Sequence, residues 1–193
     1  MDAFETVVQM LLEREGYWVR TSYKVALTKE DKRRIRRPSS PRWELDVVAY
    51  RGKSNELLVF ECKSFLDSRG VCADDLIRSH RTGGGGTYKL FTERTTRTVV
   101  LRRLASALVH DGACRSRPRV RLGLVAGRIP AKDRERLKRY FDEQNWELWD
   151  DSRLRSMLSV LSEGSYENHV AAVVAKLILR ETKRKAADDK SSH

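Results

Sequence analysis

Three charged side chains stand inside two apolar segments that follow each other in the chain. Glu61 and Lys63 lie two residues apart in L-L-V-F-E-C-K-S-F (residues 57–65), and Asp46 lies in W-E-L-D-V-V-A-Y (residues 43–50). Carboxylate oxygens are the ligands that a hard divalent cation such as Mg²⁺ prefers. An ammonium group beside them stabilises negative charge that develops on a phosphate. These residue types predict hydrolysis of a phosphodiester bond.

The two apolar segments have the pattern of a β-hairpin. Each is rich in β-branched and other apolar residues, and R-G-K-S-N (residues 51–55) between them has the composition of a turn. A four-residue loop over 52–55 pairs Arg51 with Glu56. The turn chemistry therefore predicts one particular register for the two strands.

This register brings the three charged residues together. It places Asp46 opposite Glu61, and Lys63 follows on the same face because side chains alternate along a strand. Directly opposite side chains have Cβ atoms about 4.5–5.5 Å apart. A slip of one residue would turn Asp46 to the other face. In the alternative interpretation, Glu61 and Lys63 are surface residues at a strand end and Asp46 is a polar residue on the side of the turn.

The pattern resembles the signature of the PD-(D/E)XK nuclease superfamily. That signature is an acid on one strand followed by acid-x-Lys on the next. Asp46 in E-L-D-V-V-A-Y matches the first acid, and Glu61 and Lys63 in V-F-E-C-K-S match the second part. The proline that names the family is absent before Asp46, where Leu45 stands. By order of elements, the resemblance extends over residues 3–150.

The resemblance implies a restriction-endonuclease-like core and a metal-dependent nuclease activity. It implies Asp46, Glu61 and the backbone carbonyl of Cys62 as ligands of Mg²⁺, with Mn²⁺ as an alternative metal. It also implies that Lys63 is the catalytic lysine.

Members of this superfamily often carry a Glu on a helix that precedes the strands. Glu5, in D-A-F-E-T-V-V, is the matching residue, and the resemblance implies a catalytic role for it. A structural alternative is that Asp2 and Glu5 form a capping box, D-x-x-E, at the start of the helix.

The elements around the hairpin predict an α/β fold. Apolar residues at helical spacing and short apolar runs alternate along the chain, so we expect a mixed central β-sheet flanked by helices on both faces. Residues 28–42 are interpreted as a basic loop, and residues 66–98 as irregular apart from a short helical stretch near 72–79. The expected strands cover 17–27, 43–50, 57–63, 120–126 and 146–149, and the expected helices cover 2–15, 98–110, 130–144, 152–162 and 166–185.

The order of elements predicts one main domain. We expect the nuclease domain to span residues 1–163. Residues 164–185 are expected to form a C-terminal helix that packs on the domain or on a second copy in a homodimer. The polar tail, residues 186–193, has the composition of a disordered segment.

The balance of charge predicts a polyanionic partner. The 193 residues include 39 Lys and Arg against 27 Asp and Glu, for a formal net charge of +12. Nucleic acid, DNA in particular, is the first expectation and an anionic membrane surface the second. A solvated basic loop is the alternative interpretation of the Lys and Arg run. The residues expected to bind nucleic acid are Lys32, Arg33, Arg34, Arg36, Arg37, Arg81 and Lys89.

The remaining features predict a cytoplasmic protein without a membrane partner. The first residues have neither the basic nor the apolar segment of a secretory signal. The three cysteines have no C-x-x-C spacing, and no zinc site is expected. The three charged residues, the net charge and the family resemblance together lead us to expect a Mg²⁺-dependent endonuclease that cleaves DNA in restriction, repair or defence. The alternative is a nuclease-like protein that binds nucleic acid without cleaving it.

Overall fold

The structure is a computed structural model that describes residues 2–39, 42–82, 87–163 and 172–176, the side chains of residues 78–82 excepted. The chain forms two compact units, Met1–Trp149 and Asp150–His193. The sequence predicts a first domain over residues 1–163. The structure instead assigns residues 150–163 to the second unit.

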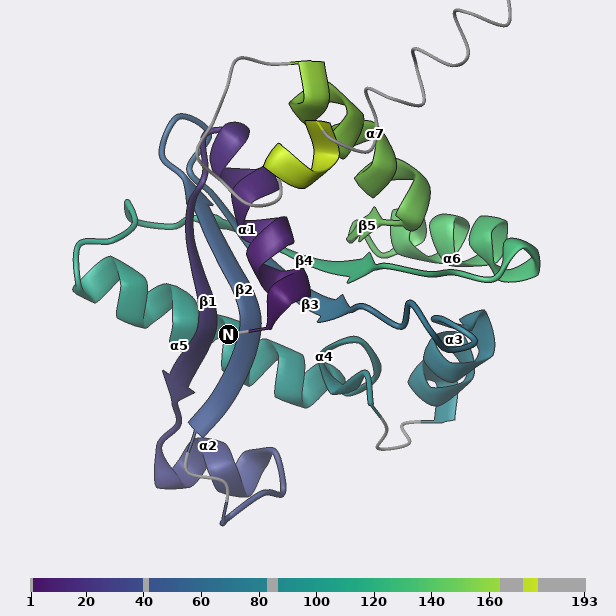
Figure 1. Cartoon of the computed structure of the whole chain (residues 1–193). Helices are drawn as coiled ribbons and strands as arrows, with labels where there is room; N and C mark the ends of the chain where they lie inside the picture. The colour runs from purple at the N-terminus through teal and green to yellow at the C-terminus, as the bar shows by residue number, and fades with distance from the viewer. Residues whose placement is uncertain (1, 40–41, 83–86, 164–171, 177–193) are drawn as a thin grey trace, which may run out of the picture. The chain divides into compact units, whose positions relative to one another are not determined.

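The first unit is built on a five-stranded mixed sheet, as the sequence predicts. The strands follow one another in the order β1-β2-β3-β4-β5, with antiparallel pairing from β1 to β3 and parallel pairing from β3 to β5 (Figure 1). The expected strands are all present, with bounds that differ by at most one residue. They are β1 (Trp18–Ala26), β2 (Arg42–Arg51), β3 (Glu56–Lys63), β4 (Arg119–Ala126) and β5 (Glu147–Trp149).

Helices cover both faces of this sheet. In Figure 1, α1 lies in front of β1 and β2, and α5 lies behind them. Buried residues of α5 belong to one apolar core with Val48 and Val59. The buried residues of α1 lie outside that core, as do Val47 and Phe60. The helices are α1 (Ala3–Arg14), α2 (Lys29–Arg34), α3 (Ala73–Thr82), α4 (Lys89–Thr92), α5 (Arg94–His110) and α6 (Ala131–Glu143).

The second unit contains α7 (Asp151–Glu163), and residues 172–176 are also helical. Of the helix expected over 166–185, only those five residues are described. The expected tail over 186–193 lies outside the described residues. The expectation of a homodimer through this helix stays a prediction.

The register between β2 and β3 is the one that the turn predicts. Arg51 pairs with Glu56 and Val48 pairs with Val59. Residues 52–55 form the turn. Asn55 has a positive φ of 49°, a conformation that Asn adopts more readily than most residues. The turn composition was therefore sufficient to align the two strands.

The side chains of β2 do not alternate regularly through Asp46. Trp43 and Leu45 come before it and Val48 and Tyr50 after it, yet all four contact the same apolar core. In a regular strand, residues 45 and 48 would face opposite sides of the sheet. The strand therefore changes phase at residues 46–47, so regular alternation alone does not determine the direction of the Asp46 side chain.

β1, the strand next to β2, is irregular at the position opposite Asp46. The β1–β2 ladder pairs Thr21 with Val47 and Tyr23 with Leu45, and the pair between them, Ser22 and Asp46, is missing. Ser22 has a positive φ of 49°. Irregular positions of this kind re-aim a side chain without changing the overall register. The site residue Asp46 thus lies where both strands depart from regular geometry.

The segment expected to be a basic loop contains a helix, α2. Thr28 and Asp31 form a capping box at its start. Asp31 is only 3% exposed and bonds Arg102 at 3.3 Å and Arg103 at 2.5 Å, both on α5. Burial alone would raise the pKa of Asp31, but hydrogen bonds from Arg103 and Thr28 lower it below its usual value. Asp31 therefore anchors α2 to α5, although the many Lys and Arg residues of this segment suggested a loop.

The segment expected to be irregular, 66–98, is also more helical than the sequence suggests. α3 continues to Thr82, α4 occupies 89–92, and α5 begins at Arg94 rather than at residue 98. The first turn of α5 is polar, so apolar spacing does not mark it. Side chains stabilise it instead: the Thr96 hydroxyl donates to the Glu93 carboxylate at 2.7 Å, and Arg97 donates to backbone carbonyls of α4.

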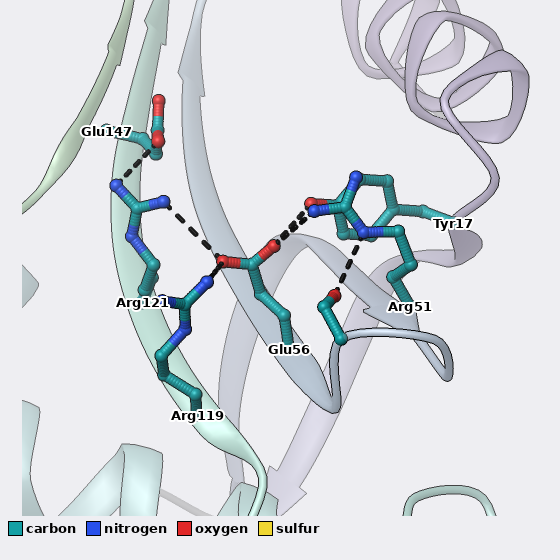
Figure 2. Close-up of polar contacts among 7 residues, drawn as sticks. Tyr17, Arg51, Glu56, Arg119, Arg121 and Glu147 are labelled. Carbon is teal, nitrogen blue, oxygen red and sulfur yellow. Dashed lines mark hydrogen bonds and ion pairs between the residues drawn. The ribbon is translucent and has the colours of Figure 1, made fainter.

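A buried carboxylate holds the first residue of β3, at the opposite end of the strand from Lys63. Glu56 is 2% exposed and accepts hydrogen bonds from Tyr17 at 2.7 Å, Arg51 at 2.8 Å and Arg119 at 2.6 Å (Figure 2). Arg121 lies 3.5 Å away. Burial alone would raise the pKa of Glu56, but hydrogen bonds from Tyr17 and Arg119 bring it below its usual value. Glu56 therefore connects β3 with β2, with β4 and with Tyr17, the residue before β1.

Among the described residues, no helix has the length and apolar character needed to cross a membrane. The three cysteines, Cys62, Cys72 and Cys114, form no disulfide.

Replacing Glu56 tests the stabilising role of this carboxylate. We expect Glu56→Gln to lower the free energy of unfolding at pH 7 by about 3 kcal/mol, since it breaks a buried ion-paired network. The folded pKa lies below the unfolded value of about 4.3, so the carboxylate stabilises fully above that pH. This contribution is lost as the pH falls through the folded pKa.

Urea unfolding of wild type and Glu56→Gln at pH 7 and near pH 3 measures this effect. The difference between the two proteins should shrink at the lower pH. Glu44→Gln is the matched control, since Glu44 is exposed on β2. Equal unfolding of Glu56→Gln and Glu44→Gln at pH 7 would refute the role given to Glu56.

Candidate active site

The ammonium group of Lys63 lies between the two predicted carboxylates. Its Nζ is 2.8 Å from Oε1 of Glu61 and 3.9 Å from Oδ2 of Asp46. The side chains of Lys63, Glu61 and Asp46 are 18%, 17% and 24% exposed, so the group is largely shielded but open to solvent on one side. The sequence prediction that these three residues meet is confirmed.

The geometry that brings them together differs from a regular cross-strand pair. The β2–β3 ladder ends at Val47 and Phe60, one pair short of Asp46 and Glu61. The Asp46 carboxylate instead accepts a hydrogen bond from the backbone amide of Cys62 at 2.7 Å. A side chain thus satisfies an amide next to the end of the ladder. This bond aims one oxygen of Asp46 at the end of β3.

Glu5 on α1 faces the same region. Asp2 caps the helix by accepting from the amides of Phe4 at 2.7 Å and Glu5 at 3.3 Å. The Glu5 carboxylate does not return the bond to Asp2, and instead accepts a long hydrogen bond from Ser22 at 3.5 Å. The capping-box alternative for Glu5 is therefore wrong, although Asp2 is the cap. Burial first, then the charge of Asp46, raise the pKa of Glu5, which shows that the two acids are close.

The site carries more negative than positive charge. Burial and then the charge of Asp46 raise the pKa of Glu61 above its usual value, and Lys63 offsets only part of this. Burial tends to lower the pKa of Lys63, but the carboxylates of Glu61 and Asp46 outweigh it, and the net shift is upward. Lys63 is therefore an ammonium ion at neutral pH. Asp46 and Glu61 share this cation, and Glu5 adds a third acid close to Asp46.

We tested whether the donor set suits the divalent cation that the resemblance implies. Among the described residues, no three His, Cys, Asp or Glu side chains converge into a metal-binding group. Mg²⁺ needs less than this, because it is commonly bound through one or two carboxylates together with water and substrate phosphate. Asp46 and Glu61 provide two carboxylates with excess negative charge, so they fit such an ion. The ligand role expected of the Cys62 carbonyl stays a prediction.

The residues expected to bind nucleic acid fall into different environments. Arg33, Arg34 and Arg36 are exposed, and Lys32 and Lys89 are half-buried. The side chain of Arg81 lies outside the described residues.

Arg37 has structural partners of its own. It pairs with Glu93 at 3.0 Å and stacks over Trp43 with 5.3 Å between its guanidinium carbon and the ring centre. Arg37 therefore has packing contacts that would compete with a phosphate.

Sequence reasoning missed Ser22, the serine that contacts Glu5. Its positive φ and its missing ladder partner depend on pairing with a strand twenty residues further on. A serine inside a strand-like segment gives no local signal of this kind. Only the asymmetry of apolar residues around positions 45 and 48 could have indicated a change of phase.

No protein-family model, no curated protein and no solved structure matches this chain. The resemblance to PD-(D/E)XK nucleases therefore stays a prediction from the residues. The geometry of Asp46, Glu61 and Lys63 is the basis for a proposed function.

Proposed function

We propose that this protein is a Mg²⁺-dependent endonuclease that hydrolyses phosphodiester bonds in DNA, built on a restriction-endonuclease-like core. One observation supports this most directly: the Lys63 ammonium lies 2.8 Å from the Glu61 carboxylate and 3.9 Å from that of Asp46 at the end of β3. The charge of +12 supports a polyanionic partner.

The negative charge of the acids must be neutralised before a phosphate can bind, and a divalent cation would do this. A phosphate approaching Glu5, Asp46 and Glu61 would be repelled, since Lys63 offsets only part of their charge. A bound Mg²⁺ would supply Lewis acidity at the phosphate and lower the pKa of an attacking water. Asp46 and Glu61 are the side chains that would hold it.

Lys63 has a role of its own in this reaction. Its ammonium can donate a hydrogen bond to the attacking water and orient it, and its charge stabilises the negative charge that develops on the phosphate oxygens. The two carboxylates fix the position of the ammonium before substrate arrives. Glu5 is placed to orient a further water through its second oxygen, a positioning role that complements that of Lys63.

The second candidate is a nucleic-acid-binding protein with a nuclease-like site and no cleavage. One observation favours it: no metal-binding group of three acidic, His or Cys side chains forms among the described residues. In that case Lys63 acts as a permanent counter-ion for Asp46 and Glu61, and DNA binds elsewhere on the basic surface. Tight DNA binding with no cleavage under any divalent cation would support this candidate.

Replacing Lys63 tests the proposed reaction. We expect Lys63→Ala to slow cleavage of plasmid DNA in Mg²⁺ by about 10²-fold or more, as expected when a group that stabilises transition-state charge is removed. EDTA should abolish cleavage by the wild type. Lys53→Ala is the matched control, because Lys53 is an exposed lysine in the turn of the same hairpin.

The control should cleave at the wild-type rate. If Lys63→Ala cleaves as fast as Lys53→Ala, the assignment of Lys63 is wrong. Single-turnover rates at saturating DNA separate a loss of chemistry from a loss of binding.

Replacing Asp46 tests the metal site without any need for cleavage. Asp46→Asn keeps an oxygen that can accept from the Cys62 amide but removes the charge. We expect Mn²⁺ affinity, measured by electron paramagnetic resonance of the free ion, to fall by about tenfold or more, since the hard cation loses a carboxylate ligand. Asp67→Asn, at an exposed aspartate in the loop after β3, should bind Mn²⁺ like the wild type. Unchanged affinity in Asp46→Asn would contradict the proposed ligand.

A further inference from the structure

A pocket opens directly after the strand that carries Glu61 and Lys63. It has a volume of about 390 Å³, within the range of pockets that bind small organic groups. Its walls come from the loop that follows β3 (Phe65 and Ser68–Gly70), from Asp75 on α3, and from Thr87 and Tyr88 before α4. The proposed reaction gives none of these residues a role.

The pocket lies beside the candidate active site. Phe65 is two residues beyond Lys63 in the chain. Tyr88 belongs to the same apolar core as Val59, which precedes Glu61 on its face of β3. Burial first, then the charges of Asp75, Cys72 and Glu61, raise the pKa of Tyr88, so the Glu61 carboxylate lies within electrostatic reach of the pocket wall.

Tyr88 gives the wall of the pocket a polar group. The residue is 5% exposed, and its ring is part of the core. Its backbone carbonyl accepts from the Thr92 hydroxyl at 3.0 Å, and among the described residues its own hydroxyl has no hydrogen-bond partner on the pocket wall. The hydroxyl of a pocket-lining Tyr88 is therefore available to a ligand.

The loop that forms one wall is held in a defined conformation. Gly70 has a positive φ of 85°, and a Cβ at this position would lie 2.6 Å from the carbonyl oxygen of Arg128. The amide of Val71 donates to the same carbonyl at 2.9 Å. The close approach requires glycine and ties the loop to the segment that follows β4. The wall is thus formed before a ligand binds, which lowers the entropic cost of binding.

The chemistry of the lining suits a nucleobase better than a phosphate. Arg69 pairs with Asp75 at 2.6 Å, so the charged residues of the wall nearly cancel. The pair and the Tyr88 hydroxyl offer both donors and acceptors, and Phe65 adds an aromatic side chain. Unstacked bases are recognised by this combination of stacking and hydrogen bonds to their edges.

The same loop carries an exposed apolar side chain. Leu66 is 62% exposed. Apolar side chains at such positions can insert into a base stack and unstack a neighbouring base.

We infer that this pocket receives an unpaired nucleobase from the nucleotide next to the cleaved phosphate, with Leu66 filling the space the base leaves in the stack. The inference rests on the proposed nuclease function. Phe65 stacks on the base, while Tyr88 and the Arg69–Asp75 pair bind its edge. The protein therefore prefers DNA with an unpaired or extrahelical base over a continuous duplex.

Binding to three fluorescent duplexes tests this inference. One has a single extra unpaired nucleotide, one is fully paired, and one has an abasic residue at the extra position. Ca²⁺ replaces Mg²⁺, because it takes oxygen ligands as well, and a gel verifies that the DNA stays intact. We expect wild type to bind the first duplex about tenfold tighter than the other two, a preference within the range of one base stacked on an aromatic side chain.

Two variants and a control assign the preference to the pocket. Tyr88→Phe removes only the hydroxyl, and Arg69→Ala removes an arginine that is 72% exposed, so both should remain folded. Each should reduce the preference to about threefold or less, since edge contacts to the base are lost. Arg136→Ala is matched to Arg69→Ala, because it breaks an exposed pair with Asp74 at 2.8 Å and lies outside the pocket. It should keep the full preference.

The possible failures are distinguishable. Equal binding of all three duplexes by wild type, together with Mg²⁺-dependent cleavage, would overturn the pocket and leave the nuclease intact. Full preference in both pocket variants would overturn it as well. Failure to bind or cleave any DNA would contradict the proposed function and the inference together.

Discussion

The hydrogen bond from the Cys62 amide to the Asp46 carboxylate is the contact on which the arrangement of the site depends. At 2.7 Å, it replaces a main-chain bond just where the β2–β3 ladder ends. It holds the first acid at the end of the second strand, so that Lys63 can reach both carboxylates. It orients the carboxylate at the phase change of β2, where regular alternation does not. The backbone irregularity of β2 and the arrangement of the site therefore depend on the same hydrogen bond.

Most of the framework could be predicted because its signals are local. The turn composition of 52–55 aligned β2 with β3, and apolar runs located the five strands. The parts that could not be predicted depend on distant partners. α2 forms around Asp31, whose arginines lie about seventy residues away on α5. The start of α5 is an exception, because its partners are nearby: Glu93 and the carbonyls of α4 stabilise a polar first turn, which apolar spacing does not mark.

The site shows the same division between local and distant signals. The residues of the motif and their meeting follow from the register, whereas the direction of Asp46 does not, because alternation assumes a regular strand. Ser22 on β1 is irregular opposite Asp46 and also contacts Glu5 on α1. Three elements thus converge on one interruption of the sheet. A pattern read along one strand contains none of this information.

Two carboxylates of β3 show how environment separates structural from chemical roles. Glu56 is bonded by a tyrosine and by arginines from two flanking strands, which hold its pKa below the usual value and leave it no capacity for a ligand. Glu61, five residues later, is shielded from water beside a second acid, with one lysine between them, and its pKa is raised. Such unbalanced negative charge is costly unless a cation binds. The same residue type on the same strand therefore stabilises the fold at one end and favours cation binding at the other.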